Sequence, residues 1–204
     1  MLSITKPSHS ELRDFLWQHQ EKPFTYSEVG ATRSGPDSIP EGYSCGRQRI
    51  RLGTGRECYL KAKACLEQWK MFPPEFVDLI WPCPIEEGRV VATLFRAPGL
   101  WTVNPCRIVY TIDSVDEDNL EKFGFAYGTV GRHLASGEER FLVEYDHKNE
   151  TTWYEVYCFS KVHHWLATLA YPYLRLQQHR FRVLSTQAMK RHAQVPSNTP
   201  ATAI

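Results

Sequence analysis

The sequence has no closely spaced pair of cysteines. Its six cysteines are scattered along 204 residues, and none belongs to a Cys-x-x-Cys motif. Zinc sites usually need that spacing, so we predict no metal site. The first residues, Met1 to Pro7, also lack the apolar core of a signal peptide. Without export the thiols stay reduced and pack as small apolar groups, and we expect a cytoplasmic protein.

Long apolar runs and a strong net charge are also absent. No run approaches the roughly 20 apolar residues that a membrane-spanning helix needs. The formal net charge of +1 gives no overall attraction to nucleic acid, so we predict no nucleic-acid partner. Acidic residues are missing from Val156 to the end, whereas basic residues continue. Peripheral membrane contact through this basic stretch is an open expectation, and the oligomeric state is not indicated.

Motifs for nucleotides are missing as well. Gly53 and Gly55 follow a predicted strand and open a predicted helix, but the third glycine of a dinucleotide fingerprint would fall at Cys58. The chain has no Walker Lys-Ser/Thr pair. We interpret these glycines as a tight turn, and we predict no cofactor.

Alternating side chains are the strongest feature that is present. Between residues 123 and 129, aromatic side chains alternate with glycine and alanine, as in a strand with one bare face. Close packing of the terminal helix is the preferred explanation for that face. Similar runs predict further strands, and their short links require antiparallel neighbours. The predicted strands cover residues 48–52, 76–81, 88–95, 100–103, 106–112, 123–129, 139–145 and 152–159.

Helices are predicted at both ends of the chain. Ser8 followed by Glu11 has the spacing of a capping box, and a helical apolar stripe follows it. A long, basic, amphipathic helix is predicted over residues 162–192. We expect residues 1–192 to form a single helix-grip domain and residues 193–204, which are small and polar, to form a disordered tail.

Together these elements predict an α+β fold. A curved antiparallel sheet would grip the long C-terminal helix, with short helices near the N-terminus. Such a sheet needs a cover for its concave face, and a long terminal helix is a common cover. Because a grip of this kind usually encloses a pocket, we expect a container for a ligand.

Five short motifs occur in an order that resembles a known family. They are Trp69-Lys70-Met71-Phe72-Pro73, Asn104-Pro105-Cys106-Arg107-Ile108-Val109-Tyr110, Phe123-Gly124-Phe125-Ala126-Tyr127-Gly128-Thr129, Ser136-Gly137-Glu138-Glu139-Arg140-Phe141 and Trp153-Tyr154-Glu155. Over residues 24–188 the chain is similar to the bacterial and plant proteins grouped as uncharacterised protein family 0548. The resemblance implies no established activity. It implies a fold similar to the helix-grip superfamily of the birch-pollen allergen and the START-like lipid-transfer proteins, which mostly bind hydrophobic molecules and include some cyclases and hydroxylase subunits.

The last predicted hairpin carries two carboxylates that could act together. If Tyr145 pairs near Thr151, then Phe141 faces Glu155, and Glu139 lies on the same face. The two glutamates would be diagonal neighbours, roughly 7–8 Å apart. Aromatic surroundings and mutual repulsion should raise their pKa values, which suits a general acid and base or a site for a cationic group.

A structural role is the alternative for both carboxylates. Each could pair with an arginine, Arg107 or Arg140 being the obvious partners, or face water. A change of register by one residue would move one strand's side chains to the other face and separate the pair. The register therefore decides between chemistry and structure.

We predict a binding protein, rather than an enzyme, for a small hydrophobic molecule of lipid-like or isoprenoid-like character. The ligand would lie between the aromatic sheet face and the C-terminal helix, with a few polar groups to orient it. The predicted ligand-binding residues are Trp69, Arg107, Phe125, Tyr127, Phe141 and Trp153. The alternative is a cyclase-like or hydrolase-like enzyme with Glu139 and Glu155 as catalytic residues. A second alternative is a partner-binding module without a cavity.

Overall fold

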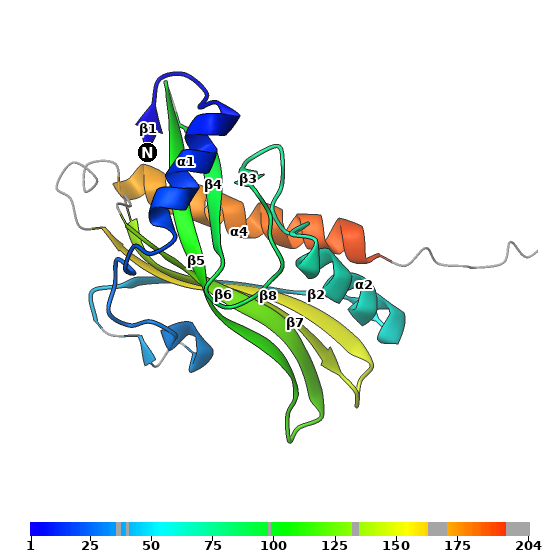
Figure 1. The fold of residues 1–204 in the computed structure, drawn as a ribbon. Helices are drawn as coiled ribbons and strands as arrows, with labels where there is room; N and C mark the ends of the chain where they lie inside the picture. The colour runs from blue at the N-terminus through cyan, green and yellow to red at the C-terminus, as the bar shows by residue number, and fades with distance from the viewer. Residues whose placement is uncertain (36–37, 40, 98, 132–134, 163–170, 195–204) are drawn as a thin grey trace, which may run out of the picture.

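A curved, eight-stranded antiparallel sheet dominates the structure (Figure 1). The computed structural model describes residues 1–204 apart from 36–37, 40, 98, 132–134, 163–170 and 195–204. Almost all of the predicted tail, and part of the predicted terminal helix, fall outside the described residues.

The strands from β3 to β8 form a meander in which each strand pairs with the next one along the chain. The full order is β2-β8-β7-β6-β5-β4-β3, and β1 pairs with β5. The strands are β1 (Leu2–Ser3), β2 (Ser44–Thr54), β3 (Asp78–Ile80), β4 (Val90–Ala97), β5 (Leu100–Val115), β6 (Leu120–Thr129), β7 (Ala135–Asp146) and β8 (Thr151–Val162). Because β2 pairs with β8, the first long strand and the last strand close one edge of the sheet.

The described helices are α1 (His9–His19), the short 3₁₀-helix η1 (Ala31–Arg33), α2 (Arg56–Glu67) and α4 (Tyr171–Ala193). The predicted capping box at α1 is confirmed, because Ser8 Oγ accepts from the Glu11 amide at 3.3 Å and Glu11 Oε2 accepts from the Ser8 amide at 2.8 Å. No described helix is long and apolar enough to cross a membrane.

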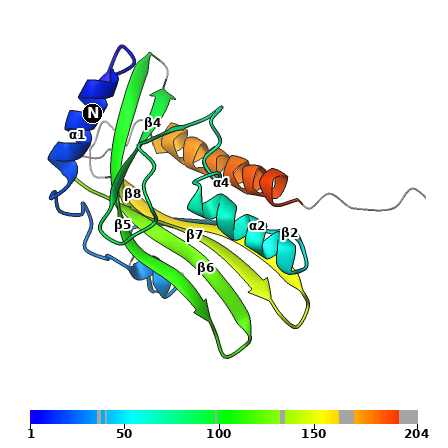
Figure 2. The same ribbon diagram turned by 45° about the vertical axis from the view of Figure 1, so that its right-hand side comes forward.

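Helices α2 and α4 lie side by side on the concave face of the sheet (Figure 2). The predicted α+β architecture, a sheet gripping a C-terminal helix, is therefore confirmed. The predicted start of that helix at residue 162 is wrong, because β8 continues to Val162, which pairs with Ala135. Packing along α4 is uneven. Its second half buries Phe181, Ser185 and Met189, whereas no residue of 171–180 is buried.

Two hydrophobic cores lie on opposite faces of β4. Val91 points into the main core on the concave side, with residues of α2 and α4. Val90, Ala92 and Leu94 point the other way and pack against Leu12 and other side chains of α1. The alternation of side chains along a strand thus lets one strand support both helical layers.

The bare face of β6 lies on the convex side and not under α4. A Cβ atom added to Gly128 would stand 1.9 Å from the Tyr26 hydroxyl oxygen, so the segment before η1 covers this face. The prediction that the terminal helix packs there is wrong, because strand parity points the aromatic side chains of β6 toward the helices and the small residues away from them.

Glu138 of β7 fastens this covering segment to the convex face. Its carboxylate accepts hydrogen bonds from the Tyr26 hydroxyl at 2.8 Å, the Gly30 amide at 2.7 Å and the Thr32 amide at 3.0 Å. The Thr32 hydroxyl also donates to it. The burial of Glu138 is therefore compensated by several donors from one loop.

Candidate functional site

One row of strand neighbours on the concave face gathers the polar groups of the candidate site. The register places Gly46 of β2 beside Cys158 of β8. It places Glu139 of β7 between Cys158 and Tyr127 of β6. Tyr127 and the next concave positions, Phe125 and Phe141, contribute to the main core, so the row faces α2 and α4.

Glu139 has one hydrogen-bond partner among the residues that the structure describes. The Tyr127 hydroxyl donates to Glu139 Oε2 at 2.8 Å. Desolvation raises the pKa of Glu139 to about 7, although the hydrogen bond from Tyr127 and the charge of Arg182 act in the opposite direction. The pKa of Tyr127 is raised in turn by burial and by Glu139, so the phenol stays protonated and donates. Glu139 can therefore change its charge near neutral pH.

Arg182 brings a positive charge from α4 to the same row. Its side chain is buried, and Nη1 donates to Cys158 Sγ at 3.4 Å. Gly46 makes room for it, because a Cβ atom there would lie 2.5 Å from the guanidinium carbon. Within the described part of the chain, neither Arg182 nor Glu139 forms an ion pair.

The thiols beside the site are neutral. Burial raises the pKa of Cys158 to about 12, and it also raises the pKa of Cys106, with Glu139 adding to both shifts. A neutral thiol is a poor nucleophile and a poor metal ligand. No group of three or more His, Cys, Asp or Glu side chains that could hold a metal occurs among the described residues.

The predicted aromatic wall exists, but other side chains of the protein cover it. Phe125 and Phe141 are both 0% exposed. The Trp69 ring lies 4.9 Å from Phe125, and the Phe72 and Phe181 rings lie 5.8 and 6.3 Å from Phe141, between centroids. Of the predicted ligand-binding residues, Trp69, Phe125, Tyr127 and Phe141 therefore come together on the concave side.

Glu155 lies on the opposite face from Glu139, so the predicted carboxylate pair is wrong. The β7–β8 register pairs Leu142 with Glu155 and Tyr145 with Thr152, one residue away from the predicted register. That single shift turns the side chain of Glu155 to the convex face. Glu139 and Glu155 consequently cannot act together as a general acid and base.

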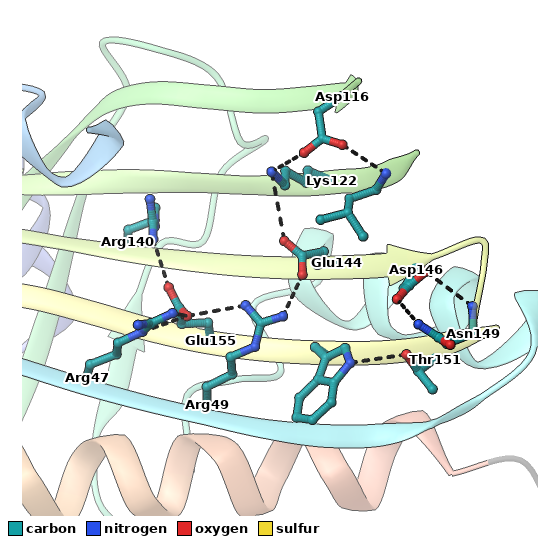
Figure 3. A network of polar contacts seen from close by, with 12 residues as sticks. Arg47, Arg49, Asp116, Lys122, Arg140, Glu144, Asp146, Asn149, Thr151 and Glu155 are labelled. Atoms are coloured by element: carbon teal, nitrogen blue, oxygen red, sulfur yellow. Dashed lines mark hydrogen bonds and ion pairs between the residues drawn. The ribbon is translucent and has the colours of Figure 1, made fainter. Parts of the chain in front are cut away.

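Arginines neutralise Glu155, as the structural alternative predicted for Arg140 (Figure 3). Arg47 Nη2 donates to Glu155 Oε2 at 2.6 Å, and Arg140 Nη2 donates to Oε1 at 2.7 Å. Burial by itself would raise the pKa of Glu155, but these hydrogen bonds outweigh it and hold the pKa below its usual value. Glu155 therefore stays ionised, and its ion pairs join β8 to the neighbouring strands β2 and β7.

Figure 3 shows that this ion network continues along the convex face. Arg49 bridges Glu155 and Glu144, and Lys122 links Glu144 to Asp116. Charges of opposite sign follow one another across adjacent strands, as cross-strand pairing favours. The network stabilises the convex surface and does not open toward the candidate site.

Two further predicted ligand-binding residues also lie away from the site. Trp153 belongs to the convex face, where the Arg49 guanidinium lies 5.1 Å from its ring centroid. Arg107 donates to the backbone carbonyl of Lys22 at 2.8 Å and lies over the Phe24 ring at 5.3 Å. Both side chains lie away from the concave face for the same reason, since strand parity gives these odd-numbered positions of β8 and β5 to the convex side.

A groove of about 720 Å³ opens on the side of the molecule where the start of α1, the end of α2 and β3 meet. Its inner wall includes Trp69, Phe72 and Val77, and its rim includes the ion pair of Lys6 with Asp78 at 3.2 Å. Phe72 also contacts the interior, because its ring lies 6.4 Å from that of Tyr127. One aromatic layer thus separates the groove from the polar row.

Arg182, Cys158 and Gly46 carry weak sequence signals and were not among the predicted site residues. Arg182 falls on the helical spacing of the buried residues Ser185 and Met189, which is unusual for a charged side chain. That spacing is the one signal that could have identified it. Nothing in the sequence shows that α4 crosses the sheet at Gly46, because only tertiary packing decides the crossing point.

Comparison with known proteins identifies the family. A family model described as Domain of unknown function (DUF1990) matches residues 25–188. The chain belongs to this family. A UPF0548 protein of Dictyostelium discoideum is 34% identical over 203 residues, covering 93% of this chain and 94% of the relative. A UPF0548 protein of Arabidopsis thaliana is 34% identical over 183 residues, covering 87% of each. The predicted membership of uncharacterised protein family 0548 is confirmed.

Solved structures resemble this DUF1990 protein in fold. The Zhui aromatase/cyclase from Streptomyces sp. R1128 has a TM-score of 0.48 and 17% identity, covering 74% of this chain and 93% of that one. The major latex-like protein 151 from Panax ginseng has a TM-score of 0.41 and 16% identity, covering 74% of this chain and 99% of that one. These likenesses concern the arrangement of strands and helices only.

Proposed function

We propose that the protein binds a small amphipathic molecule on the concave face of its sheet. One observation carries the proposal: a carboxyl, Glu139, and a buried guanidinium, Arg182, share one row of that face without an ion pair among the described residues. The hydrophobic body of the ligand would be lipid-like or isoprenoid-like, and its polar end would lie between these two groups.

The physical argument concerns the cost of burying charge. A guanidinium that is taken out of water without a carboxylate partner loses solvation free energy that a thiol cannot replace. A polar group that accepts from Arg182 and exchanges a hydrogen bond with Glu139 would compensate both side chains at once. Such polar groups fix the orientation of a ligand, whereas apolar contacts supply most of its affinity.

Glu139 is partly exposed, which supports the binding of a polar group beside it. The partial burial of this carboxyl raises its pKa. The residue nevertheless keeps part of its surface exposed, whereas Phe125 and Phe141 in the next row are completely buried. The polar end of the ligand would therefore reach the row at Glu139 and not at the centre of the aromatic wall.

The apolar body of the ligand would lie on the rings that cover that wall. Phe76 is half-buried and contacts Phe95 at 5.7 Å and Phe181 at 6.5 Å between ring centroids. The groove outside Phe72 would be the entrance for the ligand, since the Phe72 ring also lies 5.4 Å from the Phe181 ring, and its volume of about 720 Å³ lies within the usual range of small-molecule pockets. Trp69 and Phe72 would then act as the wall between groove and site.

Native mass spectrometry of protein purified from its own host tests the proposal. We expect a bound molecule of defined mass on the wild-type protein. The anionic probe 1-anilinonaphthalene-8-sulfonate, which has an apolar body, should bind at one saturable site. Arg182→Met should weaken the probe by at least tenfold, because one charge-assisted hydrogen bond is worth about 1.5–3 kcal/mol.

Arg51→Met is the matched control, since Arg51 is exposed on β2 and forms no ion pair among the described residues. Gly46→Ala adds a further test, because a Cβ atom at this position displaces the end of a flexible side chain rather than backbone. It should weaken the probe with little loss of stability. If the wild-type protein retains no small molecule and also shows no saturable binding of the probe, the proposal is refuted.

Proton transfer by Glu139 is a second candidate function. It is favoured by the pKa of about 7 and by the Tyr127 hydroxyl at 2.8 Å, since a general acid or base works best when its pKa is near the working pH. Glu139→Gln distinguishes the two functions. A variant that retains the native ligand but no longer converts it would favour catalysis, whereas an unchanged ligand in both proteins would favour carriage.

A further inference from the structure

The outward side of α4 carries exposed apolar side chains that nothing in the described structure covers. Leu176 is 56% exposed and Tyr173 is 38% exposed. They are three residues apart, so they lie on one side of the helix, and Val183, one turn further along that side, is half-buried. Isolated exposed apolar residues are common, but here they follow a line along one helix.

Positive charges accompany this apolar line, and negative charges are missing. No Asp or Glu occurs from Val156 to the end of the sequence. Arg180 and Lys190 are exposed on the same side of α4 and have no carboxylate partner among the described residues, although the Arg180 guanidinium also lies 5.5 Å from the Phe76 ring centroid. Arg191 is the exception, because it lies 3.6 Å from Glu75.

The spacing places the apolar line between basic residues. With about 100° of rotation per residue, Leu176 lies near the middle of the exposed arc, Arg180 lies on one side of it and Lys190 on the other. We name Tyr173, Leu176, Arg180 and Lys190 the outer stripe. An apolar centre with flanking cations is typical of helices that lie in the interface of a membrane.

We propose that the outer stripe docks α4 on a membrane surface that contains anionic lipids. Leu176 and Tyr173 would enter the boundary between head groups and acyl chains. Arg180 and Lys190 would pair with lipid phosphates and carboxylates, while their aliphatic stems cover the apolar surface below. A nucleic acid would use the cations but would leave Leu176 exposed to water. This inference does not depend on the proposed ligand.

Vesicle co-sedimentation with the full chain tests the inference. We expect binding to vesicles of phosphatidylcholine mixed with phosphatidylserine and much weaker binding to phosphatidylcholine alone. Leu176→Glu should lower the partition coefficient on the anionic vesicles by about tenfold or more. It removes the apolar side chain that would enter the membrane and adds a negative charge that the anionic lipids repel. Replacing Arg180 and Lys190 together by Gln should lower binding to the anionic vesicles only.

Leu60→Glu is the matched control, since Leu60 is 50% exposed on α2 and lies outside the stripe. It should leave vesicle binding unchanged. The inference is overturned if wild-type protein does not bind the anionic vesicles, or if Leu60→Glu and Leu176→Glu reduce binding equally. Binding to RNA that survives Leu176→Glu, without vesicle binding, would assign the cations to nucleic acid and also overturn it.

Discussion

Two glutamates of the same hairpin, Glu139 and Glu155, have opposite electrostatic environments. Desolvation raises the pKa of Glu139 to about 7, whereas Arg47 and Arg140 hold the pKa of Glu155 below its usual value. This difference between the two pKa values does not follow from the residue type, which is the same. It follows from the face of the sheet that each side chain occupies, which a shift of one position in the register reverses.

The raised pKa of Glu139 predicts a particular dependence of stability on pH. The folded state holds the proton more tightly than the unfolded state, whose pKa is near 4.5. Unfolding therefore releases this proton between about pH 4.5 and 7, and the contribution to stability falls as the pH rises through that window, by about 3 kcal/mol. Glu139→Gln should abolish this part of the slope in urea unfolding measured across the window.

Glu117→Gln serves as the control, because Glu117 is exposed in the β5–β6 turn. It should leave the pH dependence of the unfolding free energy as in the wild type. An unaltered slope in Glu139→Gln would show that the carboxyl is solvated in the folded protein, and the proposed site would lose its main support.

At the scale of elements, each face of the sheet has its own cover. On the concave side α2 and α4 pack by apolar side chains, whereas on the convex side a loop around η1 is held by the carboxylate of Glu138. This loop also packs aromatic side chains on the sheet, since the Tyr26 and Tyr43 rings lie 5.6 and 5.1 Å from the Phe159 ring. Hydrogen bonds to the buried Glu138 carboxylate add to this packing and fix the backbone of the loop.

Replacing Glu138 by Gln should release this loop. The amide group of glutamine offers donors where the Gly30 and Thr32 amides and two hydroxyl groups need acceptors, so buried donors lose their partners. We expect a loss of about 3 kcal/mol in the free energy of unfolding. Hydrogen exchange at the Gly30 and Thr32 amides should accelerate more than at amides of α2.

Glu28→Gln on the same loop is a suitable comparison. Glu28 lies close to solvent and accepts from the Tyr43 hydroxyl and the Ser27 amide, not from the amides that Glu138 anchors. It should change stability by less than about 1 kcal/mol. Equal effects of both variants would contradict the anchoring role of Glu138.

At the scale of the whole molecule, only the second half of α4 is buried in the hydrophobic core. Phe181 and Met189 are buried in the main core, and the Tyr154 hydroxyl lies 2.8 Å from Ser185 Oγ. The first half contributes polar contacts such as Gln178 Nε2 to Ser160 Oγ at 3.0 Å. The second half of the helix therefore holds α4 in the core, whereas the first half is packed more loosely and carries Tyr173, Leu176 and Arg180 of the outer stripe.

This division predicts unequal effects of two truncations on α4. Phe181→Ala should lower the free energy of unfolding by about 3–5 kcal/mol, because it leaves a cavity among Phe72, Phe76 and Phe141. Leu176→Ala should change it by less than about 0.5 kcal/mol, because this side chain is exposed. Chemical unfolding measures both, and equal losses would show that the helix packs along its whole length.

The sequence by itself determined the local elements and the type of fold. Alternation along β6 to β8 and the capping box at Ser8 depend on neighbouring residues, so they could be predicted without coordinates. The order of motifs also predicted the family correctly. Phe125, Tyr127 and Phe141 lie on the concave side because their strand parity was assigned correctly, and Trp69, which follows α2, packs against them.

Only the tertiary structure decided which side chains meet. The β7–β8 register places Glu155 on the convex face, and the path of α4 brings Arg182 to Gly46 and Cys158. Both depend on how separate elements dock, which involves residues far apart in the chain. Local spacing contains no information about such a contact, because many registers and crossing points satisfy the same pattern until the whole core is packed.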